Sequence, residues 1–380
     1  MRRAVLAGWV ACAATFAVAA DLAPTVPALV PAPLAGDLIQ ATVHRLPNGL
    51  TIYLSPNAQT PRIAAWIAVR TGSKMDPADC TGLAHYLEHM LFKGTPRFGA
   101  LDYTRERPHL DRITALYEER FRATDPAERE RLAKEIDREN QAASKFEIPN
   151  ELGRVYDSLG FNGLNAFTGN EYTMYICDFP RNRLEAWATA EAERFSQPVL
   201  RLFQTELETV YEEKNRSLDN PGRGLWEAFS LALFKKHPYG TQPTLGSIEH
   251  LKNPSLKRVM DFYRAHYVPN NMALVLAGDF QRKAMLELLA RHFGAWKPGP
   301  VAPAGPWELP PLRGEETVTV TFESEEQVIL GWLASANKTP EADALDVAGM
   351  LLNNGRTGII DVRLNQAQRV KGAGGGSDAR

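Results

Sequence analysis

The sequence predicts a domain of mixed strands and helices, followed by the start of a second domain. Three observations predict this. Residues 43–54 read as two strands around the turn Asn48-Gly49. Residues 63–69 form an apolar run of the length of a buried strand, and a helix is expected over 83–92. Six prolines fall within 298–311, which is typical of a linker between domains.

The composition is that of a globular protein and excludes some classes of partner. The chain has 380 residues, of which 44% are hydrophobic and 23% are charged, and its formal net charge is −2. A near-neutral chain gives no electrostatic reason to expect binding to nucleic acid or to an anionic membrane. Beyond the N-terminus, no apolar stretch approaches the length of a membrane span.

The first 20 residues have the three parts of a secretory signal peptide. Arg2 and Arg3 precede an apolar run over 4–20, which ends in the small-residue sequence Ala17-Val18-Ala19. We therefore expect the protein to be exported, to the periplasm or to the outside. A permanent N-terminal membrane anchor is the alternative, which the predominance of alanine over leucine disfavours.

The segment after the signal peptide is rich in proline. The rest of the chain has few cysteines. Residues 21–40 carry Pro24, Pro27, Pro31 and Pro33, so we expect an extended tether. Once the signal is removed, only Cys80 and Cys177 remain, and the sequence leaves open whether they pair.

A charged block at 101–148 predicts a helical hairpin inserted in the first domain. Apolar residues recur at helical spacing on both sides of Asp125-Pro126, and Glu128 completes a start resembling a capping box. We interpret the hairpin as a solvated surface feature without a catalytic role.

The remaining elements complete the predicted domains. Further strands are expected at 165–177 and 271–279, and helices at 185–195, 202–216 and 255–267. The first domain would span 41–297 and the linker 298–312. Residues 313–380, with strands at 317–322 and 328–333 and a helix at 342–352, are too short for a second copy of the first domain. We interpret them as the truncated start of a second domain.

His85-Tyr86-Leu87-Glu88-His89 is the most specific motif in the chain. On a helix, residues i and i+4 share a face, so both imidazoles can approach one ion. Imidazole nitrogen is a preferred ligand of zinc, which acidifies a bound water and polarises a carbonyl. Glu88 lies on the same side and is the candidate general base. His-x-x-Glu-His is the motif of the inverted zincins.

A third ligand has to come from another element, and the helix at 202–216 offers four glutamates. Helical spacing places Glu206 and Glu213 on one stripe with Phe203 and Val210, whereas Glu208 and Glu212 point away. Two carboxylates on a core-facing stripe require a cation such as zinc. The alternative at this point is an ordinary solvated acidic helix.

Residues 82–95, Gly-Leu-Ala-His-Tyr-Leu-Glu-His-Met-Leu-Phe-Lys-Gly-Thr, resemble the signature of the insulinase/pitrilysin family, which includes mitochondrial processing peptidase. In that family a downstream helix carries two glutamates seven residues apart, and the second binds zinc. The resemblance implies that Glu213 is the third zinc ligand and that Glu206 supports the site from behind the ligands. Residues 165–168 and 267–272 resemble further landmarks of the family.

The resemblance also implies a fold and a function. The fold is α+β, an antiparallel sheet with packed helices, and here it would carry the inserted hairpin. The function is zinc-dependent hydrolysis of peptides or unfolded protein segments by an endopeptidase with one Zn²⁺ per chain. Substrate would add as a strand at Asn165 and Ala166. Asn165 could equally be an ordinary turn amide.

Two features depart from the family pattern. The gap between His89 and Glu213 is long, and the hairpin accounts for the excess. The family's second homologous half is missing beyond its first elements, so a partner subunit could be needed to complete the active-site chamber. The alternatives are a non-catalytic peptide-binding or assembly subunit of the same fold, or an incomplete half that works only with a partner chain.

Overall fold

The computed structural model describes residues 28–30, 36–301, 303 and 305–378. The predicted signal peptide at 1–20 lies outside the described residues. The chain separates into two compact units. The first contains the described residues up to Arg216 and those of Gln242–Pro306. The second contains Ser217–Thr241 and the described residues of Trp307–Arg380. The division at Pro306 falls inside the proline-rich segment, whereas nothing in the sequence indicated that Ser217–Thr241 joins the later unit.

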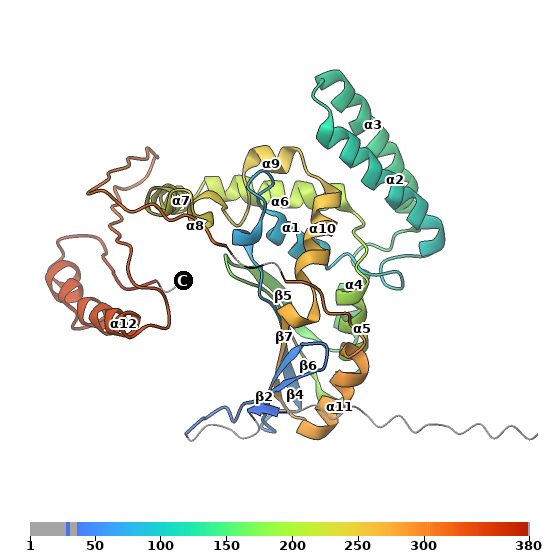
Figure 1. Cartoon of the computed structure of the whole chain (residues 1–380), viewed down its shortest axis with the longest axis horizontal. Helices are drawn as coiled ribbons and strands as arrows, with labels where there is room; N and C mark the ends of the chain where they lie inside the picture. Colours follow the sequence, from blue (N-terminus) through green and yellow to red (C-terminus); the bar gives the residue numbers. More distant parts are fainter. Residues whose placement is uncertain (1–27, 31–35, 302, 304, 379–380) are drawn as a thin grey trace, which may run out of the picture. The chain divides into compact units, whose positions relative to one another are not determined.

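A seven-stranded sheet forms the centre of the first unit (Figure 1). Its order is β1-β2-β3-β7-β4-β6-β5. The strands are β1 Ala28–Val30, β2 Thr42–Arg45, β3 Thr51–Pro56, β4 Arg62–Val69, β5 Asn162–Thr168, β6 Thr173–Pro180 and β7 Met272–Gly278. All pairs are antiparallel except β3 with β7, which is parallel. The predicted α+β fold is confirmed, with this one parallel pair as the correction.

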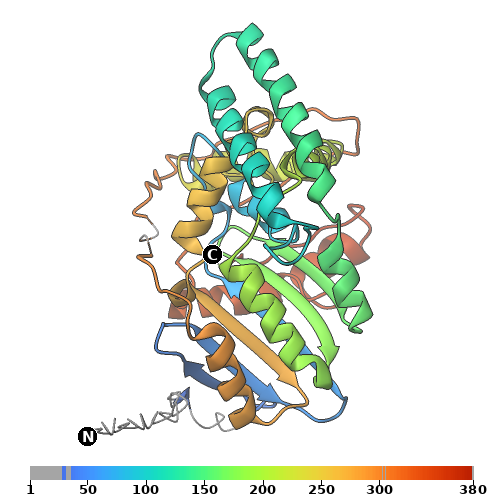
Figure 2. The same ribbon diagram turned by 90° about the vertical axis from the view of Figure 1, so that its right-hand side faces the viewer.

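Side chains alternate between the two faces of the sheet, and their burial shows which face the helices cover. On β4 the residues Ile63, Ala65, Ile67 and Val69 are buried, while Trp66 on the opposite face is 41% exposed. The covering helices include α5 Leu184–Ser196 and α11 Arg282–Phe293 (Figure 2), while α10 Leu256–His266 packs against α1 and α2. Their apolar faces and the inner side chains of the sheet form one continuous core.

The inserted hairpin predicted from the charged block is present. Helices α2 Tyr103–Arg122 and α3 Pro126–Ala143 lie side by side (Figures 1 and 2) and bury Ile113, Leu116 and Leu132. The Asp125 side chain caps α3 by accepting a hydrogen bond from the amide of Ala127 at 3.2 Å.

The first unit contains further helices. They are α1 Leu83–Met90, α4 Glu151–Ser158, α6 Phe203–Leu218, whose last turn passes into the second unit, and α9 Ile248–Lys252. Short 3-10 turns occur at Ser73–Met75, Ser144–Phe146, Arg181–Arg183 and Pro269–Asn271. The single strand expected at 165–177 is a hairpin of β5 and β6, and α4, α9 and α11 were not predicted.

The second unit contains helices α7 Pro221–Phe234, α8 Pro238–Thr241 and α12 Pro340–Leu352, with a π-helical turn at Asp361–Gln366. The strands predicted at 317–322 and 328–333 are wrong, since neither segment is a strand. Val328, Leu330 and Trp332 are 74–83% exposed. A β-strand needs a neighbour for its backbone hydrogen bonds, and neither segment has one among the residues described.

Two further findings concern cysteines and membranes. Cys80 and Cys177 are both buried and free, so they do not pair with each other. Among the described residues, no helix has the length and apolar character needed to cross a membrane.

Candidate metal centre

Gly82 and the carboxyl group of Asp76 stabilise the N-terminus of the helix that carries the histidine motif. Gly82 precedes α1 with φ +88°, a left-handed conformation that suits glycine. A Cβ at this position would lie 3.0 Å from the Cα of Gly246. The buried carboxyl group of Asp76 accepts hydrogen bonds from the amides of Gly82 and Ala84 at 2.7 and 2.9 Å. These bonds satisfy two amide groups that the helix itself leaves without partners.

Packing then fixes which way the motif faces. Helix α1 packs against α10, β5 and β6, and Ala84, Leu87 and Met90 are fully buried. His85 and Glu88 are also buried, at 7% and 6% exposed. The imidazole rings of His85 and His89 lie 4.7 Å apart between centroids, as the spacing of four residues predicts.

Helix α6 is attached to α1 through its first turn. The Tyr86 hydroxyl donates a hydrogen bond to the carbonyl oxygen of Phe203 at 2.6 Å. The Phe203 ring also packs edge-on against the rings of Tyr86 and Tyr117. Glu206 follows one turn later, and Glu213 two turns after that. Phe203, Glu206 and Val210 are buried while Glu208 and Glu212 are exposed, so the helical phase is as predicted.

His85, His89 and Glu213 each offer one ligand atom to a common point. These three atoms all lie within 4.8 Å of one another. Oε2 of Glu213 is 3.6 Å from Nε2 of His85 and 3.6 Å from Nε2 of His89. Zinc bonds of about 2.0–2.1 Å in tetrahedral geometry place ligand atoms roughly 3.4 Å apart. The donor set and its spacing therefore fit zinc.

Glu206 supports His89 from the far side of its ring. Oε2 of Glu206 lies 3.2 Å from Nδ1 of His89, which leaves Nε2 directed at the site. The other oxygen of Glu206 pairs with the ammonium group of Lys93. A carboxylate on the non-coordinating nitrogen is the usual partner of a zinc-binding histidine. Sequence reasoning gave Lys93 no role, although the residue lies in the signature segment.

Glu88 lies beside these residues but points to a different partner. Its Oε2 accepts a hydrogen bond from the Thr168 hydroxyl on β5 at 2.5 Å. Burial raises the pKa of Glu88, and the charge of Glu213 adds to the rise, while Thr168 and His89 oppose it. A carboxyl group with a raised pKa is a stronger base than an ordinary glutamate, and its place beside a metal-type donor set makes it the candidate general base.

The charge balance of the cluster favours a bound cation. Burial alone would lower the pKa of His89, but Glu206, Glu88 and Glu213 together raise it. Three carboxylates surround the two imidazoles, and Lys93 neutralises only Glu206. Glu88 and Glu206 are buried whereas the Glu213 side chain is 46% exposed, so a cation here would compensate negative charge that is partly removed from water.

The predicted substrate residues lie on the strand next to this cluster. Asn165 and Ala166 are on β5, an edge strand whose one neighbour in the described part of the chain is β6. Asn165 is exposed and pairs with Ile176. The outer edge of β5 therefore has backbone groups that could pair with a further strand.

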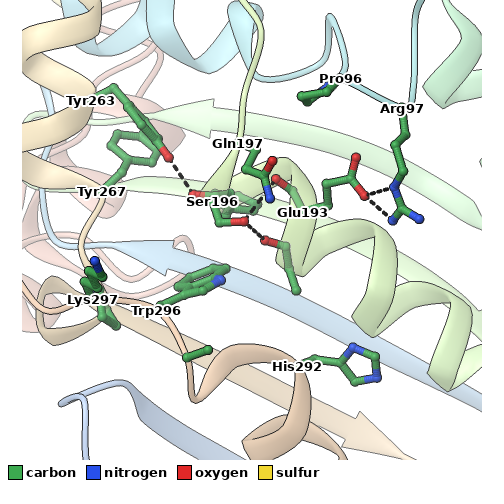
Figure 3. Close-up of a pocket in the computed structure, with 14 residues that line it drawn as sticks. Pro96, Arg97, Glu193, Ser196, Gln197, Tyr263, Tyr267, His292, Trp296 and Lys297 are labelled. Atoms are coloured by element: carbon green, nitrogen blue, oxygen red, sulfur yellow. Dashed lines mark hydrogen bonds and ion pairs between the residues drawn. The ribbon is translucent and has the colours of Figure 1, made fainter.

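A cavity of about 770 Å³ in the first unit does not include the metal-type residues. Figure 3 shows Tyr263, Tyr267 and Trp296 on one side and Ser196, Gln197 and Glu193 on the other. Its charged side chains Arg97 and Glu193 pair with each other. The candidate site is the open cluster on α1 and α6 rather than this cavity.

Comparison with known proteins identifies a family. Residues 51–109 match the family model described as "Insulinase (Peptidase family M16)", and residues 254–379 match "Peptidase M16 inactive domain". An uncharacterized zinc protease of Mycobacterium leprae is 26% identical over 254 residues, 66% of this chain and 45% of that protein. Zinc protease PqqE of Helicobacter pylori is 24% identical over 333 residues, 86% of this chain and 64% of that protein. The chain thus spans roughly half to two thirds of the length of these two relatives.

Solved structures show the same fold. A protease from Helicobacter pylori superposes with a TM-score of 0.62 and 20% identity, over 87% of this chain and 70% of that one. The first half of the periplasmic protease PqqL from Escherichia coli gives a TM-score of 0.53 and 18% identity, over 71% of this chain and 49% of that one. These likenesses show a shared fold, and the two family models place residues 51–109 and 254–379 of the chain in the insulinase family of peptidases, family M16.

Proposed function

We propose that the protein is a zinc-dependent endopeptidase that hydrolyses peptides or unfolded protein segments. The observation that carries the proposal is the convergence of His85, His89 and Glu213 within 4.8 Å, with the Glu88 carboxyl group beside them. Relatives named zinc proteases support it.

Each residue has a distinct task in the proposed reaction. His85, His89 and Glu213 would hold one Zn²⁺, and Glu206 would keep the Nε2 atom of His89 directed at the ion. Zinc in such a site acidifies a water molecule and polarises the substrate carbonyl. Glu88 would accept the proton of the attacking water and deliver it to the leaving amine. Burial raises the pKa of Glu88, which makes its carboxylate a stronger base for the first of these transfers.

We propose that substrate binds in extended form along β5. An edge strand can add a peptide strand through backbone hydrogen bonds that are independent of the peptide's sequence. Asn165 and Ala166 are on this strand, two to three residues before Thr168, which contacts Glu88. A peptide added here would run past the metal-type cluster, as hydrolysis at an internal bond requires.

Two broader proposals concern the whole protein. Because the chain spans only part of its relatives' length, we propose that a second homologous half or partner subunit completes the active-site chamber. We also propose export from the cytoplasm, supported by the N-terminal sequence and by the likeness to the periplasmic protease PqqL from Escherichia coli.

The decisive experiment measures zinc and turnover together. Purified protein, alone and mixed with a chain bearing the second half, is assayed on a quenched fluorescent peptide. Zinc is counted by mass spectrometry. We expect about one Zn²⁺ per chain, and loss of activity on chelation that added Zn²⁺ reverses. Glu88→Gln should retain zinc and lose at least about 100-fold in kcat, whereas the exposed Glu212→Gln should match wild type.

The same experiment separates the alternatives. Zinc binding without turnover in any mixture, together with measurable peptide affinity, would favour a peptide-binding subunit. Absence of zinc would contradict the peptidase proposal itself. Activity that appears only on mixing would identify a half that needs its partner.

A further inference from the structure

We propose that Thr168 is a positioning residue that orients the Glu88 carboxylate for proton transfer, an inference that rests on the function proposed above. The Thr168 hydroxyl lies 2.5 Å from Oε2 of Glu88. Within the described residues it is the only side chain that donates a hydrogen bond to Glu88. The bond joins the sheet to helix α1, so it crosses between two elements that are far apart in sequence.

The hydrogen bond leaves the two carboxylate oxygens of Glu88 in different environments. The Thr168 hydroxyl uses one lone pair of Oε2, and no described side chain donates to Oε1, so Oε1 is the more open acceptor for a proton from water. A glutamate side chain otherwise samples several rotamers, and restricting them in advance lowers the entropic cost of reaching the reactive geometry. Thr168 thereby selects both the oxygen that reacts and its direction.

Thr168 can do this because its own position is rigid. The turn that follows it is docked on the segment before α1. Amides of Ser73 and Lys74 donate to the carbonyl oxygens of Gly169 and Asn170 at 3.0 and 3.1 Å. The Asn170 amide group also donates to the Ser73 hydroxyl at 3.0 Å. A β-branched side chain on a fixed strand has few χ1 choices, so the hydroxyl direction is largely determined by the backbone.

The same contact connects the general base to the proposed substrate strand. Ala166 lies two residues before Thr168, a distance of roughly 6–7 Å along an extended strand. A peptide paired with β5 would therefore have its register set by the strand that orients Glu88. Strand β5 would then position both the substrate backbone and the Glu88 carboxylate, and so would control the geometry of the attack on the peptide bond.

This arrangement predicts an effect on turnover and not on binding. Thr168→Val keeps the size and β-branching but removes the hydroxyl, and Thr168→Ser keeps the hydroxyl. We expect Thr168→Val to lower kcat by about 10- to 100-fold with KM and zinc content within about twofold of wild type. Thr168→Ser should retain most of the wild-type kcat. In a Glu88→Gln background, Thr168→Val should cause no further loss.

A second measurement does not depend on activity. Crystal structures of wild type and Thr168→Val should show one ordered Glu88 carboxylate in the first and a reoriented or multiply placed carboxylate in the second. Peptide affinity, measured by fluorescence anisotropy in the Glu88→Gln background, should be unchanged by Thr168→Val.

Three results would overturn the inference: wild-type kcat in Thr168→Val, equal losses in the Val and Ser variants, or loss of zinc from Thr168→Val. An unmoved Glu88 carboxylate in the Thr168→Val crystal would also overturn it. The proposed function fails differently, because its failure would appear as turnover that survives Glu88→Gln or as a wild-type protein without zinc.

Discussion

Arg201 and Glu106 form a fully buried, bidentate ion pair that joins the inserted hairpin to the segment just before α6, the helix that carries Glu213. Nε and Nη2 of Arg201 lie 2.8 and 3.0 Å from the two carboxylate oxygens of Glu106, and the two side chains are 1% and 0% exposed. The remaining donors of Arg201 bond to the carbonyl oxygens of Lys93, Thr95 and Phe98. The pair therefore also fixes the loop that follows α1.

This geometry predicts a large loss of stability when one partner is removed. Glu106→Gln leaves a buried guanidinium without its counter-ion, so we expect the free energy of unfolding to fall by about 3–5 kcal/mol. Urea denaturation followed by circular dichroism measures this. Lys134→Ala is the matched control, since Lys134 and Glu130 form an exposed pair on the same hairpin. It should cost no more than about 0.5 kcal/mol. Equal costs for the two variants would contradict the role given to Arg201.

The three glutamates of α6 should differ in their effect on zinc. Glu213→Gln removes an anionic ligand and should weaken zinc binding most, by more than the roughly 10- to 100-fold expected when an outer partner is lost. Glu206→Gln should fall in that lower range, because Glu206 contacts Nδ1 of His89 and the ammonium group of Lys93 and is not one of the three proposed ligands. Glu212→Gln should have no effect, since its side chain is exposed. Zinc content after equilibration with a competing chelator checks the order. A dominant effect of Glu212 would place the third ligand elsewhere.

Local periodicity explains why part of the candidate site was predictable. The helix of His85 and the phase of α6 depend on residues within a few turns of each other, and both agree with the structure. The contact of Thr168 with Glu88 depends on sheet pairing and on α1 packing over β5, which no local pattern encodes. The same reason applies to Lys93, whose ammonium group pairs with a residue more than a hundred positions away.

The predicted strands of the second unit are wrong because their apolar side chains were assumed to be buried. Residues 328–333, Val-Ile-Leu-Gly-Trp-Leu, form an apolar run that is typical of a buried strand, yet Val328 and Trp332 are 83% and 78% exposed. An apolar run shows that a segment could pack in a core, and not that a core is there to receive it. The central sheet was predicted better because its strands have strong apolar runs.

A pH-dependent effect on stability is expected from Glu147. Burial raises the pKa of Glu147 to about 7, with a further contribution from the charge of Glu106, while Arg201 opposes the rise. The ordinary value is 4.5, so the folded state holds the proton between pH 4.5 and about 7 while the unfolded state does not. The stability contributed by this group is complete below pH 4.5 and is lost as pH rises through about 7.

Glu147→Gln should therefore gain stability relative to wild type as the pH is raised. The difference between the two unfolding free energies should be small near pH 5 and should increase up to about pH 8. Urea titrations at several pH values measure it. Glu130→Gln is the control, because Lys134 lowers the pKa of exposed Glu130 and no such increase is expected. A flat difference for Glu147 would show that its carboxyl group is ionised at neutral pH.

Lys93 should stabilise the metal site without touching the metal. Its ammonium group pairs with Glu206, whose other oxygen holds the Nδ1 atom of His89. Without Lys93, the buried Glu206 carboxylate loses its cation and its pKa rises, so it holds His89 less firmly. We expect Lys93→Met to weaken zinc binding about tenfold, within the range seen for outer partners of metal ligands. Lys93→Arg should retain most of the affinity because it keeps the positive charge. If Lys93→Met and wild type bound zinc equally at neutral pH, the carboxylate of Glu206 would need no counter-ion, and the charge balance derived for the cluster would be wrong.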